Sequence, residues 1–312
     1  MIKDILKVTE QLDAELAAIG DNRDRAARER RAQLEKERAA ALEKCCDLTP
    51  EDRVFLSRHP QRPKIDDYIN ALFTDFFEQK GDRQCKEDAS MLGGIALYRG
   101  RPVTVVGQRK GRNLEENLKY NFGMPGPEGY RKALRMMKQA EKFGRPIITF
   151  IDTPGAYPGL EAEERGQGEA IARNLAEMSL LKVPVIAVVT GEGASGGALA
   201  IGVANKILML ENAIYSVLSP EGFASILWKD SSRHAEACDI MKLTAQDLYN
   251  FGIVEKIIKE PRGGAQIAPE QLFLSLDASL NETLSELSHM SGDELARDRY
   301  NKFRKIGQPT DN

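Results

Sequence analysis

Two apolar stretches decide the fold class of this chain: Pro146-Ile-Ile-Thr-Phe-Ile151 and Pro184-Val-Ile-Ala-Val-Val189. Each has the length and β-branched composition of a strand, and each is followed by a glycine-rich loop and a helical pattern. Uninterrupted apolar strands that alternate with helices are typical of a parallel sheet covered on both faces. The sequence therefore predicts an α/β fold.

The flanking sequence extends this alternation in both directions. A hairpin is expected where two strand-like runs meet at Arg99-Gly-Arg101. A helix is expected over residues 65–79, and a glycine-rich loop is expected over residues 190–197, from which a helix starts at Gly196. The other predicted elements are helices over 127–143, 165–181, 269–287 and 293–305, and strands over 206–210, 213–218 and 253–258.

The N-terminal residues follow a different, purely helical pattern. Large apolar residues recur at spacings of three and four, which marks one face of a helix: Ile5, Val8, Leu12, Leu16 and Ile19. Residues 21–44 then indicate a second helix that is polar nearly all round. Two interpretations remain open, a solvated helical hairpin and an arm that docks onto another subunit.

Composition excludes several classes of protein. The 312 residues include 44 Lys+Arg and 47 Asp+Glu, so the formal net charge of −3 argues against a general nucleic-acid binder. The four cysteines form no C-x-x-C pair, so we expect neither a disulfide framework nor a metal site in this chain. The N-terminus lacks a signal peptide's apolar core, and no apolar run has the length of a membrane helix. We expect a cytoplasmic protein without membrane contact.

Two loops at strand ends, residues 152–159 and 190–197, are the candidates for chemistry. The carboxyl ends of strands are where α/β proteins bind ligands. The second loop places Gly196 and Gly197 at a helix start, where unpaired N–H groups and the helix dipole attract a negative oxygen. If that oxygen gains charge during the reaction, the same amides form an oxyanion hole. The alternative is a tight turn that needs small residues only for packing.

The second loop also contains Gly193-Ala-Ser-Gly-Gly197, which matches the G-x-S-x-G nucleophile elbow of serine hydrolases. The two histidines that follow Ser195, His234 and His289, lie in polar segments and are poor candidates for a triad. The first loop begins with the D-x-x-G of GTPases, but the chain has no G-x-x-x-x-G-K-[ST] phosphate loop, which excludes that class.

Charged residues near these loops give weaker signals. No acidic pair is marked out by spacing, so these carboxylates are expected to be solvated or structural: Asp152, Glu161, Glu163, Glu164 and Glu192. Three basic residues in a glycine-bounded loop are the candidates for contact with a phosphate or an acidic partner: Arg109, Lys110 and Arg112.

Several long motifs, in order along the chain, carry a resemblance to a known family. They are Arg58-His-Pro-Gln-Arg-Pro63, Asn121-Phe-Gly-Met-Pro125, Pro127-Glu-Gly-Tyr-Arg-Lys-Ala-Leu134, Asp152-Thr-Pro-Gly-Ala-Tyr-Pro-Gly159, Glu163-Glu-Arg-Gly-Gln167, Gly191-Glu-Gly-Ala-Ser-Gly-Gly-Ala-Leu-Ala200 and Ser219-Pro-Glu-Gly222. Over roughly residues 57–264 the chain resembles the carboxyltransferase alpha subunits of multisubunit, bacterial-type acetyl-CoA carboxylases. Many members have Gly-His-Gln-Lys-Gly where this chain has Gly107-Gln-Arg-Lys-Gly111, so no histidine role carries over to Gln108.

The resemblance implies a crotonase/ClpP-like superhelix of stacked ββα units with a helical N-terminal arm. It divides the chain into the arm (1–56), a crotonase-like carboxyltransferase domain (57–264) and C-terminal helices (265–312). It implies an enzyme that transfers the carboxyl group of carboxybiotin to acetyl-CoA, which gives malonyl-CoA for fatty acid synthesis. Activity is then expected only with the beta subunit, in an α2β2 heterotetramer.

The resemblance also implies partners and site residues. Carboxybiotin is expected on a separate biotin carboxyl carrier protein, ATP is used by the partner biotin carboxylase, and zinc is held by the beta subunit. The amides of Gly196 and Gly197 would stabilise the anionic urea oxygen that is left on biotin. The residues expected to line the biotin pocket are Gly155, Ala156, Tyr157, Gly193 and Ser195. A stand-alone crotonase-type acyl-CoA enzyme and a serine hydrolase remain alternatives.

Overall fold

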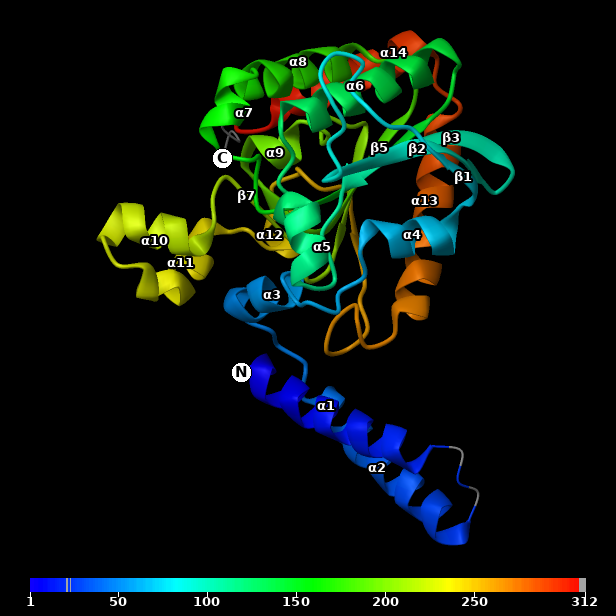
Figure 1. Cartoon of the computed structure of the whole chain (residues 1–312), viewed down its shortest axis with the longest axis vertical. Coiled ribbons are helices and arrows are strands. Elements are labelled where there is room, and N and C mark those ends of the chain that lie inside the picture. The colour runs from blue at the N-terminus through cyan, green and yellow to red at the C-terminus, as the bar shows by residue number, and fades with distance from the viewer. Residues whose placement is uncertain (21, 23, 309–312) are drawn as a thin grey trace.

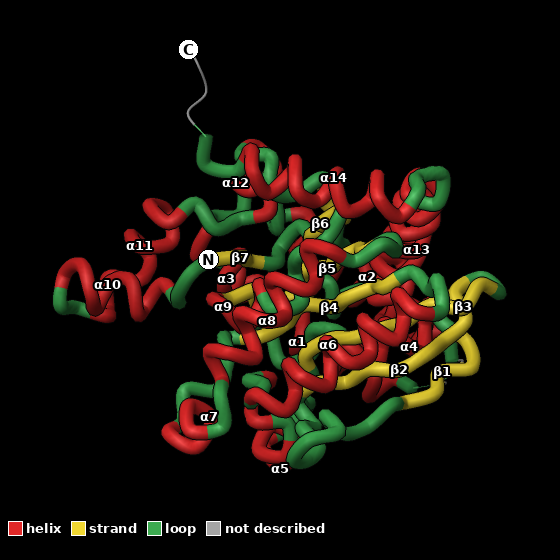
Figure 2. Tube along the Cα trace, turned by 90° about the horizontal axis from the view of Figure 1, so that it is seen from above, coloured by secondary structure: helices red, strands yellow, loops and turns green. Residues whose placement is uncertain are grey.

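The computed structural model describes residues 1–20, 22 and 24–308. Its centre is an eight-stranded sheet in the order β1-β2-β3-β4-β5-β6-β8, with β7 paired to β5. In the view from above, strands β1 to β6 follow one another across the molecule (Figure 2). The strands are β1 (Thr74–Glu78), β2 (Met91–Tyr98), β3 (Arg101–Gln108), β4 (Ile147–Thr153), β5 (Val185–Ala194), β6 (Lys206–Leu210), β7 (Ile214–Ser216) and β8 (Lys256–Ile258).

The sheet is antiparallel at one edge and parallel elsewhere. β2 and β3 form the expected hairpin, and Arg99 and Gly100 both have positive φ (49° and 76°), as a tight two-residue turn requires. From β3 through β4 and β5 to β6 and β8 the pairing is parallel. β4 and β5 are buried along their whole length, which explains why both read as continuous apolar runs.

Helices cover both faces of the sheet, and most of the core lies between these layers (Figure 1). α6 (Pro127–Lys142), α8 (Gln167–Leu180) and α14 (Gly292–Lys305) lie on one side. α4 (Ile65–Leu72) and α13 (Pro269–Leu287) lie on the other. Leucines of the two C-terminal helices, α13 and α14, join the main core cluster. The α/β fold class is therefore confirmed.

The N-terminal helices project from this body as an arm (Figure 1). α1 (Ile2–Ile19) and α2 (Arg25–Glu43) pack side by side, and α3 (Pro50–Ser57) leads into the body. A small apolar cluster fixes the base of the arm: Ile2, Leu6, Cys45 and Leu56. Residues 21 and 23 of the predicted second helix lie outside the described residues.

Short helices complete the chain. They are α5 (Leu114–Lys119), α7 (Leu160–Glu164), α9 (Ser195–Leu199), α10 (Pro220–Trp228), α11 (His234–Met241) and α12 (Ala245–Asn250), with 3-10 turns at Asn121–Gly123 and Ser231–Arg233. α10 and α11 form a lobe that projects to one side of the body (Figure 1). No helix among the described residues is long and apolar enough to cross a bilayer.

Two sequence-based predictions of local structure are wrong. The helix predicted over 65–79 ends at Leu72, and the residues from Thr74 to Glu78 form the edge strand β1, because pairing with β2 decides their conformation. The glycine-rich loop predicted from Thr190 is strand as far as Ala194, because Glu192 pairs with Ile214 of β7 and extends β5.

Candidate active site

A strand-to-helix turn lies at the carboxyl end of β5. Ser195 has a left-handed backbone (φ 58°) and begins α9, a helix of five residues. No side chain caps the start of this helix. The first-turn amides of a helix have no partner within the helix. The N–H groups of Gly196 and Gly197 are therefore free of helical and side-chain cap partners.

The loop after β4 packs directly against this turn. A Cβ atom on Gly197 would lie 2.6 Å from the nitrogen of Ala156 and 2.7 Å from the carbonyl carbon of Gly155. Such distances are too short for real carbon atoms, so Gly197 must lack a side chain. A Cβ on Gly196 would meet only the methyl groups of Ile171, at 3.5 and 3.8 Å. The structure thus brings the two predicted loops into contact.

The other predicted biotin contacts lie at different depths. Ser195 is exposed and Gly196 is half-buried, whereas Gly193 lies under the ring of Tyr215, which a Cβ would approach to 2.8 Å. The ring of Tyr157 lies against Gly159. The backbone N–H of Tyr157 donates to the carbonyl of Pro125 at 3.0 Å. Ser195 and Gly196 are the predicted site residues that open to the neighbouring cavity described below.

A largely buried network of ion pairs lies at the ends of β4 and β5, next to the turn. Lys110 Nζ lies 2.7 Å from Asp152 Oδ1 and 2.8 Å from Glu192 Oε2. Arg58 Nε lies 2.7 Å from Glu192 Oε1, and its Nη1 lies 2.7 Å from Glu221 of α10. Asp152 Oδ1 also accepts the N–H of Glu192 at 3.0 Å. These contacts join the ends of β4 and β5 to the α10–α11 lobe.

The network keeps Glu192 and Lys110 charged. Burial by itself raises the pKa of Glu192, but the charges of Lys110 and Arg58 outweigh it and bring that pKa to about 2. Burial alone would lower the pKa of Lys110, but the carboxylates of Asp152 and Glu192 raise it above its usual value. Groups held in this state are poor general acids or bases near neutral pH.

The basic loop after β3 is not a free landing site for phosphate. Lys110 is engaged in the network, Arg109 pairs with Asp66 and Arg112 pairs with Asp67 (2.6 Å). Each of the three predicted phosphate contacts therefore has a carboxylate partner of its own, and the interpretation of this loop as a landing site is not supported. The interpretation of Asp152 and Glu192 as structural carboxylates agrees with their burial and pairing.

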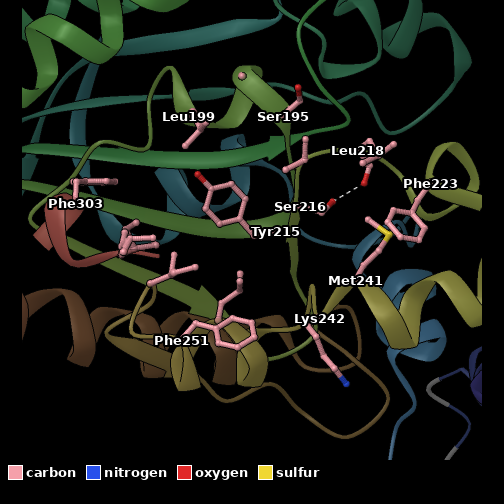
Figure 3. Close-up of a pocket in the computed structure, with 16 residues that line it drawn as sticks. Ser195, Leu199, Tyr215, Ser216, Leu218, Phe223, Met241, Lys242, Phe251 and Phe303 are labelled. Atoms are coloured by element: carbon pink, nitrogen blue, oxygen red, sulfur yellow. Dashed lines mark hydrogen bonds between the residues drawn. The ribbon is translucent and has the colours of Figure 1, made fainter. Parts of the chain in front are cut away.

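An apolar cavity of about 580 Å3 opens beside the turn (Figure 3). Side chains from α9, β7, α10, α11, α12 and α14 converge on it, including Leu199, Tyr215, Phe223, Met241, Phe251 and Phe303. Lys242 reaches its rim, with the nitrogen directed away from the other lining residues (Figure 3). Sequence reasoning missed this cavity because its lining comes from helices, strands and loops that are separated along the chain.

The residues of a serine hydrolase are not assembled at the elbow. The left-handed backbone of Ser195 fits a nucleophile elbow, but no hydrogen bond joins its hydroxyl to any histidine of the described chain. His59 accepts from the N–H of Gln61, and His234 lies 3.3 Å from Glu51. The described residues also contain no group of three or more His, Cys, Asp or Glu side chains that could hold a metal ion.

Comparison with known proteins identifies the family. A family model described as acetyl co-enzyme A carboxylase carboxyltransferase-like matches residues 2–307. A relative from Clostridium acetobutylicum, named acetyl-coenzyme A carboxylase carboxyl transferase subunit alpha, is 57% identical over 271 residues, which cover 87% of this chain and 99% of the relative. A relative of the same name from Geobacillus kaustophilus is 57% identical over 281 residues, covering 89% and 86%.

Solved structures agree on the fold. The transcarboxylase 12S structure superposes with a TM-score of 0.56 at 20% identity and covers 76% of this chain and 44% of that one. A Pseudomonas malonate decarboxylase hetero-tetramer gives a TM-score of 0.56 at 17% identity, over 70% of this chain and 87% of the other. The predicted crotonase-like architecture is therefore confirmed. This chain belongs to the family of acetyl-CoA carboxylase carboxyltransferase alpha subunits.

Proposed function

We propose that the backbone amides of Gly196 and Gly197 are the catalytic groups that this chain contributes to carboxyl transfer. The family is that of the acetyl-CoA carboxylase carboxyltransferase, and the reaction gives malonyl-CoA from acetyl-CoA. The observation that carries the proposal is the uncapped first turn of α9, where two successive glycine amides lack helical and side-chain cap partners. Such amides bind an oxygen better as it becomes negative.

The residues present fit a negatively charged urea oxygen. Neither glycine places a side chain between its N–H and a ligand, and Gly196 lies at the mouth of the apolar cavity. Gly155, Ala156, Tyr157, Gly193 and Ser195 are proposed to surround the biotin ring. Carboxybiotin, when bound, supplies the carboxyl group and, after losing it, a basic ring nitrogen. No side-chain nucleophile of this chain is then required, which agrees with the fully paired state of Lys110, Asp152 and Glu192.

The beta subunit is proposed to close the site. An alpha subunit of a multisubunit carboxylase implies such a partner. The cavity beside Gly196 is lined almost entirely by apolar groups, and large apolar side chains next to it are exposed: Val217 (78%), Ile226 (68%) and Leu227 (56%). Apolar surface of this kind marks an interaction site. We propose that the beta subunit covers this surface and supplies the zinc and most of the acetyl-CoA site, in an α2β2 assembly.

The remaining partners and the domain boundaries are proposed from membership of the family. Biotin is proposed to arrive on its carboxyl carrier protein, after ATP-dependent carboxylation by biotin carboxylase, in the cytoplasm. Residues 57–264 are proposed as the carboxyltransferase domain, with residues 1–56 as an arm and 265–312 as C-terminal helices. The small apolar cluster at the base of the arm includes a contact with Ile267, so the arm is packed onto the rest of the chain at that point.

The test is carboxyl transfer from malonyl-CoA to biocytin, which runs the reaction backwards. The chain is assayed alone and in a purified complex with a zinc-ribbon beta subunit from the same organism. We expect activity only in the complex. A complex that forms but transfers nothing would refute the proposal, whereas activity of the chain alone would favour a stand-alone crotonase-type enzyme.

A matched pair of variants locates the chemistry. Gly196→Val places a branched side chain beside the proposed donor, at a position where a Cβ makes only ordinary contacts. We expect transfer to fall by roughly 10²–10³-fold, as for loss of an oxyanion donor. Ser195→Ala, one residue away, should retain transfer within about threefold of the native chain, far below the ~10³–10⁴-fold loss expected for a nucleophile. Retained transfer by a folded Gly196→Val complex would remove the assignment.

A further inference from the structure

Gln108 links three parts of the candidate site through one side-chain amide. It is the last residue of β3 and is only 1% exposed. Its Nε2 donates to the carbonyl oxygen of Gly197 at 3.0 Å, and its Oε1 accepts the N–H of Asp152 at 3.3 Å. The same group therefore contacts α9 and the end of β4, from which the loop with Gly155 and Ala156 departs.

α9 depends on such outside support. A helix of five residues is too short to be stable alone. The N–H of Ile201 donates to Ala198 (3.3 Å) and not to Gly197, so Gln108 supplies the donor for the Gly197 carbonyl. Asn174 Nδ2 and Thr149 Oγ1 similarly donate to the carbonyls of Ala200 and Ile201, at 3.0 and 2.8 Å. Three side chains thus bond the carbonyls of α9 and of the two residues that follow it.

Gln108 differs from the other two because it also bonds the end of β4, which leads into the facing loop. Asp152, whose N–H it accepts, is the residue that Lys110 binds and that accepts the N–H of Glu192. The distance between the first turn of α9 and the Gly155–Ala156 peptide is set by close contact at Gly197. A shift of the Gln108 side chain would therefore change how the Gly196–Gly197 amides lie relative to the Gly155–Ala156 peptide.

We propose that Gln108 is a positioning residue for carboxyl transfer, which holds the Gly196–Gly197 amides in register with the loop after β4. The inference rests on the proposed function of those amides. This positioning role requires one uncharged side-chain group with both a hydrogen-bond donor and an acceptor, which a glutamine amide provides. A neutral histidine also carries one donor and one acceptor, whereas methionine has a similar length but offers no donor and only a weak acceptor.

The experiment compares Gln108→Met, Gln108→His and Thr149→Val in complexes with the beta subunit. kcat and KM for biocytin are measured in the malonyl-CoA reaction, with thermal unfolding of each complex recorded alongside. We expect Gln108→Met to lower kcat by roughly 10- to 100-fold, since small misplacements of catalytic groups have effects of this size, and to change KM less. Gln108→His at pH 8 should recover at least half of that loss on a logarithmic scale.

Thr149→Val is the matched control. It removes the hydrogen bond to the carbonyl of Ile201, just beyond α9, and leaves the contact between Gln108 and Asp152 in place. We expect it to lower the unfolding temperature and to leave kcat within about threefold. The inference is overturned if Gln108→Met keeps kcat within threefold of the native complex, if histidine restores nothing, or if Thr149→Val lowers kcat equally. The proposed function fails separately, if the native complex does not transfer at all.

Discussion

Replacing Lys110 by methionine tests whether the buried ion-pair network holds the site together. Lys110 Nζ lies 2.7 Å from Asp152 and 2.8 Å from Glu192. Glu192 would still have Arg58 at 2.7 Å. For Asp152, Lys110 is the cation within 4 Å among the described residues. The variant therefore leaves a carboxylate that is 7% exposed with the N–H of Glu192 as its hydrogen-bond donor among the described residues.

The size of the effect follows from Glu192. Its pKa is about 2, compared with an ordinary value of 4.5. At about 1.4 kcal/mol per pH unit, this difference corresponds to about 3 kcal/mol of stability, shared between Lys110 and Arg58. The loss at Asp152 adds to the share of Lys110. Removing one partner of a buried pair costs about 3–5 kcal/mol in other proteins, so we expect Lys110→Met to lower the free energy of unfolding by about 3 kcal/mol at pH 7.

The pH dependence distinguishes this mechanism from a simple packing defect. Because the folded-state pKa of Glu192 lies below 4.5, its ion pairs stabilise the native fold above about pH 4.5, and the contribution is lost as the pH falls to about 2. Without Lys110 the folded-state pKa of Glu192 should lie closer to its ordinary value of 4.5. The difference between native and variant unfolding free energies should therefore stay constant from pH 7 to about 4.5 and shrink as the pH falls from there towards 2.

The assay is urea unfolding followed by circular dichroism at pH 7 and at about pH 3, inside the range over which Glu192 titrates. The control is Lys138→Met, which removes a cation that is 46% exposed and pairs with Glu141 at 2.7 Å. Surface pairs contribute about 0–1 kcal/mol, so the control should change little. Equal losses for the two variants at pH 7, or a loss for Lys110→Met that does not depend on pH, would refute the reasoning.

Two further predictions concern the packing of the turn and the surface beside it. Gly197→Ala forces a carbon to within 2.6 Å of the nitrogen of Ala156, so we expect it to lower the free energy of unfolding by about 1–3 kcal/mol. Gly196→Ala should lower it by less than about 1 kcal/mol. Urea unfolding of the two variants measures the difference. Leu227→Glu changes a side chain that is 56% exposed, so the isolated variant should melt within about 1 °C of the native chain. Its Kd for the beta subunit, measured by calorimetry, should rise at least tenfold. An unchanged Kd would place the interface elsewhere.

Local periodicity predicted most of the fold. The helix expected over 269–287 matches α13 and the strand expected over 206–210 matches β6. Both have strong repeats that their surroundings reinforce. The edge strand β1 was missed because Thr74–Glu78 follows α4 with no turn signal, and only pairing with β2 makes it a strand. Edge strands carry little pattern of their own when one side lacks a neighbour.

The sequence predicted which backbone segments form the candidate site, but not the ion pairs that hold these segments together. Glycine spacing identified residues 152–159 and 190–197, and these two loops do meet. The contact of Lys110 with Asp152 and Glu192 depends on the parallel pairing of β4 with β5, in which Thr153 lies opposite Gly193. Register of this kind is set by the whole sheet, so spacing along the chain cannot show which carboxylates share a cation.

The two glycines of the turn answer different requirements. Gly197 is needed by the fold itself, because any side chain there would collide with the Gly155–Ala156 peptide. Gly196 is not, because its Cβ would find only ordinary contact with Ile171, and its φ is not left-handed. Alanine would fit there and favours helix more than glycine does. The described fold therefore gives no reason for glycine at this position, which is half-buried and opens to the cavity. A ligand that comes against this position, as in the proposed function, would account for the glycine, and Gly196→Ala in the complex measures how much of the activity depends on it.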